Sequence, residues 1–239
     1  MKKFTKVVAR VFTLVCLAVG LSASVTADDC PPSEVSLDHV IWAVPDLDEY
    51  AVKFEEKTGI KPVYGGEHTN GVTANYLVAL GDCIYLEIVG PKQGVDLSAF
   101  GEAAEKYRKT SIIGFAFGVQ DMTKARKTFA ERGIVTGDPR EGGRNKPDGA
   151  YVGWKTTNFP ASNFGDNNLV FAIEWRTKPH PASTSPKGLR IVKLLVQGIS
   201  APGLDGIVNQ YAMPIELTQG PRVRFALQVA TPKGIVTLD

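Results

Sequence analysis

Two stretches of the chain share one order of apolar and polar positions. Residues 39–60 and residues 114–134 each begin with an apolar strand, pass through Val-x-Asp-Leu/Met into an amphipathic helix, and end on Gly-Ile. Asp46 and Asp121 suit the position before a helix, because a carboxylate accepts hydrogen bonds from the unpaired N–H groups of a helix N-terminus. The repeat therefore predicts two copies of one strand–helix unit.

Short apolar segments follow each predicted helix. In the first copy, residues 75–80 and 83–89 are separated by Gly81-Asp82, which predicts a hairpin. In the second copy, residues 150–154 and 169–176 predict the corresponding strands. Each copy is therefore interpreted as a βαβββ module, and residues 97–109 predict an amphipathic helix that connects the two.

The remainder of the chain repeats the same order of elements more weakly. Residues 178–187 are rich in Pro, Ser and Thr, which predicts a linker. Beyond it, the pattern predicts a strand, a short helix and two further strands, at residues 190–197, 204–211, 222–229 and 235–238. The expected fold class is α+β: paired βαβββ modules form a curved mixed sheet around a concave cup, with helices outside and a degenerate third module at the C-terminus.

The N-terminus has the pattern of a secretory signal peptide. Four basic residues precede an apolar run at residues 11–21, and Val25-Thr26-Ala27 supplies small residues at the cleavage positions. We expect cleavage near Ala27, a periplasmic or secreted protein, and no membrane association afterwards. The expected division is residues 1–27 as signal peptide, 28–181 as the paired-module domain and 182–239 as the C-terminal extension.

Removing this leader changes the charge and the number of cysteines. The chain has 27 basic and 25 acidic residues, and four of the basic ones lie in the leader, so residues 28–239 carry 23 against 25, a formal charge of −2. No basic stripe remains, and we expect no nucleic-acid partner. Cys16 leaves with the leader. Cys30 and Cys83 then form a disulfide or stay as two free thiols, because the sequence does not give the distance between them.

Strand alternation predicts which side chains face the cup. With the larger apolar residues turned towards the helices, His39, Tyr85, Glu87 and Glu174 face inward, together with the small Gly114. On the last strand, the residues assigned to the helix side are Leu169, Phe171, Ile173 and Trp175. Two carboxylates beside an imidazole need a cation or hydrogen-bond donors. A divalent metal with nitrogen and oxygen ligands would satisfy them, and so would Asn, Thr and Tyr neighbours or water.

Three runs of sequence carry a family resemblance: LDHVIWAVPDL, GGEHTNGVTANYLVALGDCIYLEIVGP and VFAIEWRTKPHP. Together they resemble the glyoxalase-like branch of the vicinal oxygen chelate superfamily. The resemblance implies four inward residues, two from each module, that bind a divalent metal. His39 and Glu87 match the first-module positions and Glu174 matches the position on the last strand. The fourth position matches Gly114, which cannot bind a metal. His68, His180 or water would then have to supply the fourth ligand. The alternative is that this protein does not bind the metal.

Two functions follow from these residues and the resemblance. In the first, an exported protein binds a small carbonyl or hydroxy ligand around a divalent metal (Zn, Mn, Ni or Fe) held by His39, Glu87 and Glu174. Glu174 or His68 would transfer protons, and the reaction would be that of a lyase, an isomerase or a dioxygenase. In the second, a metal-free binding protein holds the ligand with Asn75, Tyr85 and the space left by Gly114. A monomer and a homodimer are both compatible with the sequence.

Overall fold

The computed structural model describes residue 30 and residues 33–160, 169–199, 201 and 203–239. The predicted signal peptide lies outside these residues. Among the described helices, none combines the length and the apolar character needed to cross a membrane.

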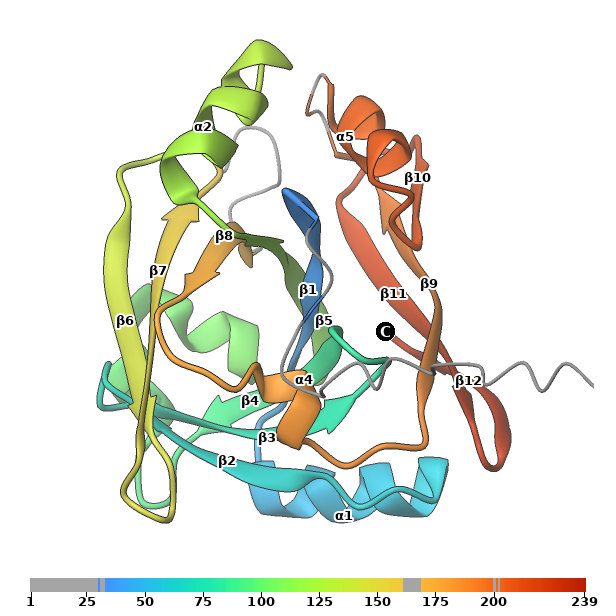
Figure 1. The fold of residues 1–239 in the computed structure, drawn as a ribbon. Helices are drawn as coiled ribbons and strands as arrows, with labels where there is room; N and C mark the ends of the chain where they lie inside the picture. The colour runs from blue at the N-terminus through green and yellow to red at the C-terminus, as the bar shows by residue number, and fades with distance from the viewer. Residues whose placement is uncertain (1–29, 31–32, 161–168, 200, 202) are drawn as a thin grey trace, which may run out of the picture.

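The two predicted modules are present and together form a closed eight-stranded barrel (Figure 1). The first contains β1 (Val35–Ala43), α1 (Leu47–Thr58), β2 (Val63–His68), β3 (Thr73–Ala79) and β4 (Tyr85–Pro91). The second contains β5 (Ser111–Val119), α2 (Met122–Glu131), β6 (Arg140–Asn145), β7 (Tyr151–Asn158) and β8 (Leu169–Trp175). The strand order is β1-β4-β3-β2-β6-β7-β8-β5. In each module the first strand pairs in parallel with the last, so the sheet is mixed as predicted.

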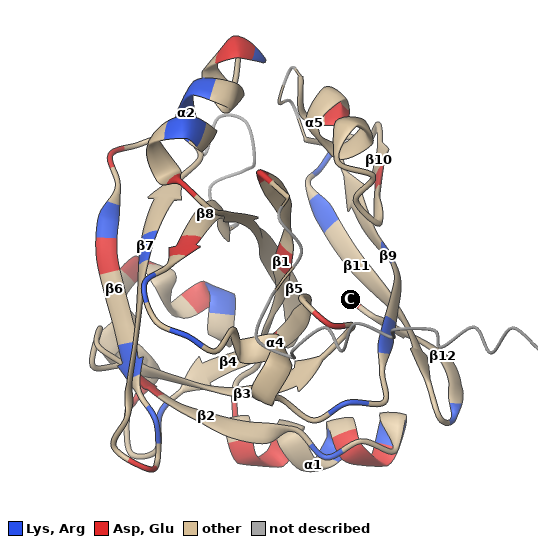
Figure 2. Ribbon diagram, in the orientation of Figure 1, with Lys and Arg blue, Asp and Glu red and all other residues tan. Residues whose placement is uncertain are grey.

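The helices begin and end where the sequence predicts. The Asp46 carboxylate accepts a hydrogen bond from the Glu49 amide at 2.9 Å, and Asp121 accepts from the amides of Thr123 and Lys124. Gly59 ends α1 in the left-handed conformation, with a φ of 80°. Between these ends, α1 turns Phe54 into the core and carries acidic and basic residues on its exposed turns (Figure 2). The repeated helix is thus fixed by its own caps and its apolar face.

Two connections and two strands differ from the sequence-based expectation. The segment that connects the modules, η1 (Leu97–Tyr107), is a 3₁₀ helix interrupted at Gly101, where φ is +54°. Part of the predicted linker is a short helix, α4 (Pro181–Thr184), capped by the His180 side chain. The sequence pattern does not predict strands β2 and β6. The pairs Gly65-Gly66 and Gly142-Gly143 interrupt the alternation of apolar and polar residues there.

The C-terminal segment forms a second sheet beside β5 (Figure 1). It contains β9 (Arg190–Gln197), α5 (Leu204–Gln210), β10 (Ile215–Thr218), β11 (Arg224–Thr231) and β12 (Gly234–Leu238). The order of elements is that of a βαβββ module, but the strand order is β10-β9-β11-β12, so its first strand pairs with the second and third strands. Phe225 packs against Phe115 of β5, with ring centroids 6.1 Å apart. This sheet packs on the outer side of the barrel at β5.

Candidate functional site

A cavity of about 450 Å³ lies inside the barrel. Its aromatic lining is Tyr85, Tyr107, Trp154, Phe171 and Trp175. Five of the polar residues that line it come from five different strands: His39, His68, Asn75, Glu87 and Arg144. An apolar cavity of this size with a few converging polar groups is typical of a small-molecule site.

His39 is held by a buried carboxylate that precedes it in the chain. Consecutive residues of a strand normally point to opposite faces, but the register of β1 shifts between Leu37 and His39, and Asp38 Oδ1 lies 2.6 Å from His39 Nδ1. The His39 ring also stacks on Tyr85, with centroids 4.7 Å apart. When Nδ1 donates to Asp38, the Nε2 of the neutral imidazole faces the cavity as an acceptor.

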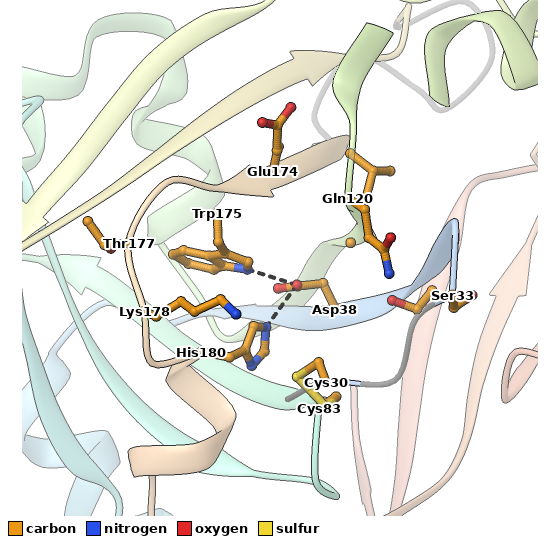
Figure 3. Close-up of a pocket in the computed structure, with 13 residues that line it drawn as sticks. Cys30, Ser33, Asp38, Cys83, Gln120, Glu174, Trp175, Thr177, Lys178 and His180 are labelled. Carbon is orange, nitrogen blue, oxygen red and sulfur yellow. Dashed lines mark hydrogen bonds and ion pairs between the residues drawn. A yellow bond between two sulfur atoms is a disulfide. The ribbon is translucent and has the colours of Figure 1, made fainter. Parts of the chain in front are cut away.

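Two further donors converge on Asp38 from the end of β8 and the segment after it (Figure 3). Trp175 Nε1 donates to Asp38 Oδ2 at 2.9 Å, and His180 Nε2 lies 3.0 Å from the same oxygen. His180 Nδ1 accepts from the Ala182 amide, so its Nε2 carries the hydrogen that points to Asp38. Burial alone would raise the pKa of Asp38, but the bonds and charges of His180 and His39 hold it well below its usual range.

Glu87 is the second anchored group of the cavity. Its Oε1 accepts from Asn75 Nδ2 at 2.8 Å and lies 3.2 Å from His68 Nε2, while its Oε2 lies 3.8 Å from His39 Nε2. Burial raises the pKa of Glu87, but His68, His39 and Asn75 outweigh that effect and lower the pKa to about 2. The carboxylate is therefore ionised at neutral pH, with one oxygen still turned towards His39.

Residues 37–210 match the family described as a glyoxalase-like domain. The chain belongs to that family.

One solved structure with a TM-score above 0.5 shows the same fold, and others are similar at lower scores. A hypothetical protein from Staphylococcus aureus is 14% identical, with a TM-score of 0.59 over 80% of this chain and 88% of that one. Methylmalonyl-CoA epimerase from Mycobacterium tuberculosis is 18% identical, with a TM-score of 0.43 over 62% of this chain and 93% of that one. A hypothetical protein from Bacillus halodurans is 15% identical, with a TM-score of 0.44 over 61% and 98%. A search of curated proteins gives no significant match.

The structure gathers most of the predicted inward residues around one cavity. His39, His68, Asn75, Tyr85 and Glu87 all line it, in agreement with the alternation of β1 and β4. Their chemical roles stay predictions, because position alone does not assign them.

Glu174 is the exception, because the predicted orientation of β8 is wrong. Phe171, Ile173 and Trp175 line the cavity, whereas Val170 and Ala172 belong to the main core cluster. Glu174 therefore lies on the outer face, where its Oε2 accepts from the Met122 amide at 2.8 Å and its Oε1 contacts Arg176. A carboxylate at the N-terminus of α2 complements the helix dipole.

Gly114 contributes close packing of two strands. A Cβ atom at this position would lie 1.8 Å from the backbone oxygen of Leu169 in β8. Gly114 is not among the residues that line the cavity. The structural reason for glycine here is thus the parallel contact of β5 with β8, and the predicted contact of Gly114 with a ligand is not supported.

The donor set predicted for a metal is not assembled. With Glu174 outside the barrel, His39 and Glu87 are the only members of that trio at the cavity. Within the part of the chain that is described, no three His, Cys, Asp or Glu side chains are arranged to hold a metal ion. The divalent metal that the sequence resemblance implies does not fit these residues as they are placed.

The two cysteines that lie outside the predicted signal peptide are joined. Cys30 and Cys83 form a disulfide with a Cα–Cα distance of 5.3 Å, which ties the N-terminal segment to the start of β4. The disulfide borders a second, outer pocket of about 300 Å³ that Asp38 and His180 also line (Figure 3). Of the two arrangements that the sequence left open, the structure has the bridge.

Asp38 and Arg144 are two polar residues of this site that sequence reasoning missed. Asp38 belongs to a strand whose alternation assigns it to the outer face, and only the register shift brings it to His39. Arg144 belongs to β6, which the Gly-Gly pair concealed. The similar pair Gly65-Gly66 before His68 was the available signal for Arg144, because the two strands pair there.

Proposed function

We propose that the protein is exported and binds a small oxygenated organic ligand, one with a hydroxyl group next to a carbonyl, in the barrel cavity. The observation that carries the proposal is the pair formed by His39 Nε2 and Glu87 Oε2. The Nε2 of a neutral His39 and the Oε2 of an ionised Glu87 are both acceptors, and the two atoms lie 3.8 Å apart. Since two acceptors cannot bond to each other, each needs a donor from elsewhere, and a ligand hydroxyl placed between them can donate its hydrogen to either one.

The remainder of the cavity supports this ligand class. Asn75 and His68 keep Glu87 in place, and Asp38 keeps His39 in place, so both acceptors are preorganised before a ligand arrives. The aromatic side chains around them offer apolar surface to a carbon skeleton. Volumes of about 300–1,000 Å³ are typical of sites that enclose small ligands.

A second function, proton transfer, is favoured by the Asp38–His39 pair. An imidazole whose Nδ1 donates to a buried carboxylate becomes a better base at Nε2. In this arrangement His39 would accept a proton from a ligand hydroxyl or from carbon next to a carbonyl, and Glu87 would stabilise the resulting imidazolium. The chemistry would be that of an isomerase or a lyase.

Binding is tested by calorimetry with residues 28–239 against dihydroxyacetone and hydroxyacetone, which have a hydroxyl group next to a carbonyl, and against their deoxygenated counterpart, acetone. We expect the oxygenated probes to bind and Glu87→Gln to weaken them at least tenfold. Glu56→Gln, an exposed change on α1, is the matched control and should have no effect. Absence of binding by both oxygenated probes, or equal binding by Glu87→Gln, would contradict the proposal.

Two further measurements test whether the site binds a metal and whether the protein is exported. Elemental analysis of natively purified protein and of a His39→Ala/Glu87→Ala variant is expected to show the same metal content. A stoichiometric divalent metal that the variant loses would replace the metal-free proposal. Export is tested by fractionating cells and sequencing the mature N-terminus, which should begin near Asp28.

A further inference from the structure

Arg144 places a buried positive charge on the wall of the cavity. It belongs to β6 and is paired with His68 of the neighbouring strand β2, and both side chains line the cavity. Only 4% of its surface is exposed. Arginine is among the residues least often buried at this level unless a partner accompanies it.

The chain supplies Arg144 with one neutral acceptor. Its Nη1 donates to the backbone oxygen of Gly65. Among the described residues, no Asp or Glu oxygen lies within 4.0 Å of its guanidinium, since no ion pair is formed there. A guanidinium has five N–H donors in a planar fork, so most of them have no acceptor from the protein.

The acidic residues nearby already have other partners. Glu87 takes its hydrogen bonds from Asn75 and His68. Glu141, at the rim of the cavity, lies beside Lys155 and Arg176. The charge of Glu87 acts on Arg144 from a distance, but no carboxylate contacts the guanidinium, and an anion with paired oxygens is its best complement.

We propose that Arg144 binds an anionic group of the ligand, a carboxylate or a phosphate, so that the substrate class of this cavity is a small organic anion. This inference rests on the proposed function, because the hydroxyl of the same ligand lies between His39 and Glu87. The guanidinium fork binds two oxygens of the anion, which fixes one end of the molecule.

The surroundings of Arg144 leave room for such a molecule. Gly142 and Gly143 precede it, and a Cβ on Gly142 would lie 2.5 Å from Trp154 Nε1, so glycine allows the indole to lie over the strand. Trp154 packs edge-to-face against Trp175 and against His68, with centroids 5.6 and 6.0 Å apart. An apolar wall thus runs between the cationic end and the end that accepts the hydroxyl.

The competing explanation is structural. The bond from Arg144 to Gly65 joins β2 to β6, where the two modules meet over only two register pairs. A residue with that role alone would lower stability when it is replaced, but would not make the cavity prefer anions over neutral molecules. The ratio between the affinity for an anion and the affinity for its neutral counterpart therefore distinguishes the two explanations.

The experiment uses two matched pairs of probes with residues 28–239: mandelate against mandelamide, and dihydroxyacetone phosphate against dihydroxyacetone. Calorimetry is run on the wild type, Arg144→Gln, Arg144→Lys and the control Arg140→Gln, which changes an exposed arginine of the same strand. We expect one anion to bind at least tenfold more tightly than its neutral partner. Arg144→Gln should remove that preference while leaving the neutral probe within about twofold, and Arg140→Gln should leave both unchanged.

Each outcome has one meaning. A preference in the mandelate pair identifies a carboxylate site, and one in the phosphate pair identifies a phosphate site. Neutral probes that bind as tightly as the anions, or an Arg144→Gln variant that keeps the preference, overturn the inference and leave the proposed function standing. Failure of all four probes would overturn the proposed function and this inference with it. Arg144→Lys should keep part of the preference, because it keeps the charge without the fork.

Discussion

Replacing Asp38 by asparagine removes the charge from a buried carboxylate that three donors share. Oδ2 faces Trp175 Nε1 and His180 Nε2, and Oδ1 faces His39 Nδ1. An asparagine of the same shape keeps one acceptor oxygen but turns an NH₂ group towards one of these donors. At least one buried donor then loses its acceptor, and the other bonds lose their charge assistance.

The expected loss of unfolding free energy is about 3 kcal/mol. Hydrogen bonds to charged groups contribute about 1.5–3 kcal/mol each, and removing one member of a buried charged pair costs about 3–5 kcal/mol. For a chain of this size, 1 kcal/mol corresponds to roughly 2–4 °C in Tm, so Asp38→Asn should melt roughly 6–12 °C below the wild type. His39 should also change tautomer, because an amide NH₂ in place of Oδ1 favours an Nδ1 that accepts.

The assay is urea unfolding at several pH values, together with ¹⁵N NMR of the histidine rings. The pKa of Asp38 is lower in the folded protein than its usual 3.8, so its contribution is present above that pH and is lost as the pH falls towards the folded pKa. The difference between wild type and Asp38→Asn should therefore be largest near neutral pH and should shrink below about pH 4.

Asp121→Asn is the matched control. Asn caps a helix about as well as Asp, so this exposed substitution should change stability by less than about 0.5 kcal/mol. An Asp38→Asn protein as stable as that control at pH 7, with an unchanged His39 tautomer, would refute the reasoning.

Two further predictions concern Glu174 and the disulfide. Glu174→Gln removes a negative charge from the N-terminus of α2, so unfolding should become about 1 kcal/mol easier while affinity for the probes stays the same. A large loss of affinity would instead place Glu174 at the cavity. Cys83→Ser opens a loop between residues 53 positions apart, which should cost about 4 kcal/mol by the loop-entropy relation. Chemical denaturation should show this loss, and reducing agent should bring the wild type to the same stability; equal stabilities before reduction would argue against the bridge.

Much of the fold followed from local patterns. The helices α1 and α2 carry their own capping aspartates and apolar faces, and these act within a few residues of one another. The inward positions of His39 and Glu87 could be predicted because side chains alternate along a strand. In these two strands the face that packs on the helices is clearly apolar. The same rule failed on β8, because both of its faces are apolar enough to be buried, and alternation separates two faces without saying which is inside.

The sequence by itself determined the paired modules, their helix ends and the His39–Glu87 pair, because capping and strand periodicity are short-range effects. Tertiary structure alone decided the rest of the site. His180 reaches Asp38 from 142 residues away, Arg144 reaches Gly65 from 79 residues away, and the contact of β5 with β8 makes Gly114 a packing position. These contacts depend on where the closing barrel places separate strands, and no local pattern of residues encodes that placement.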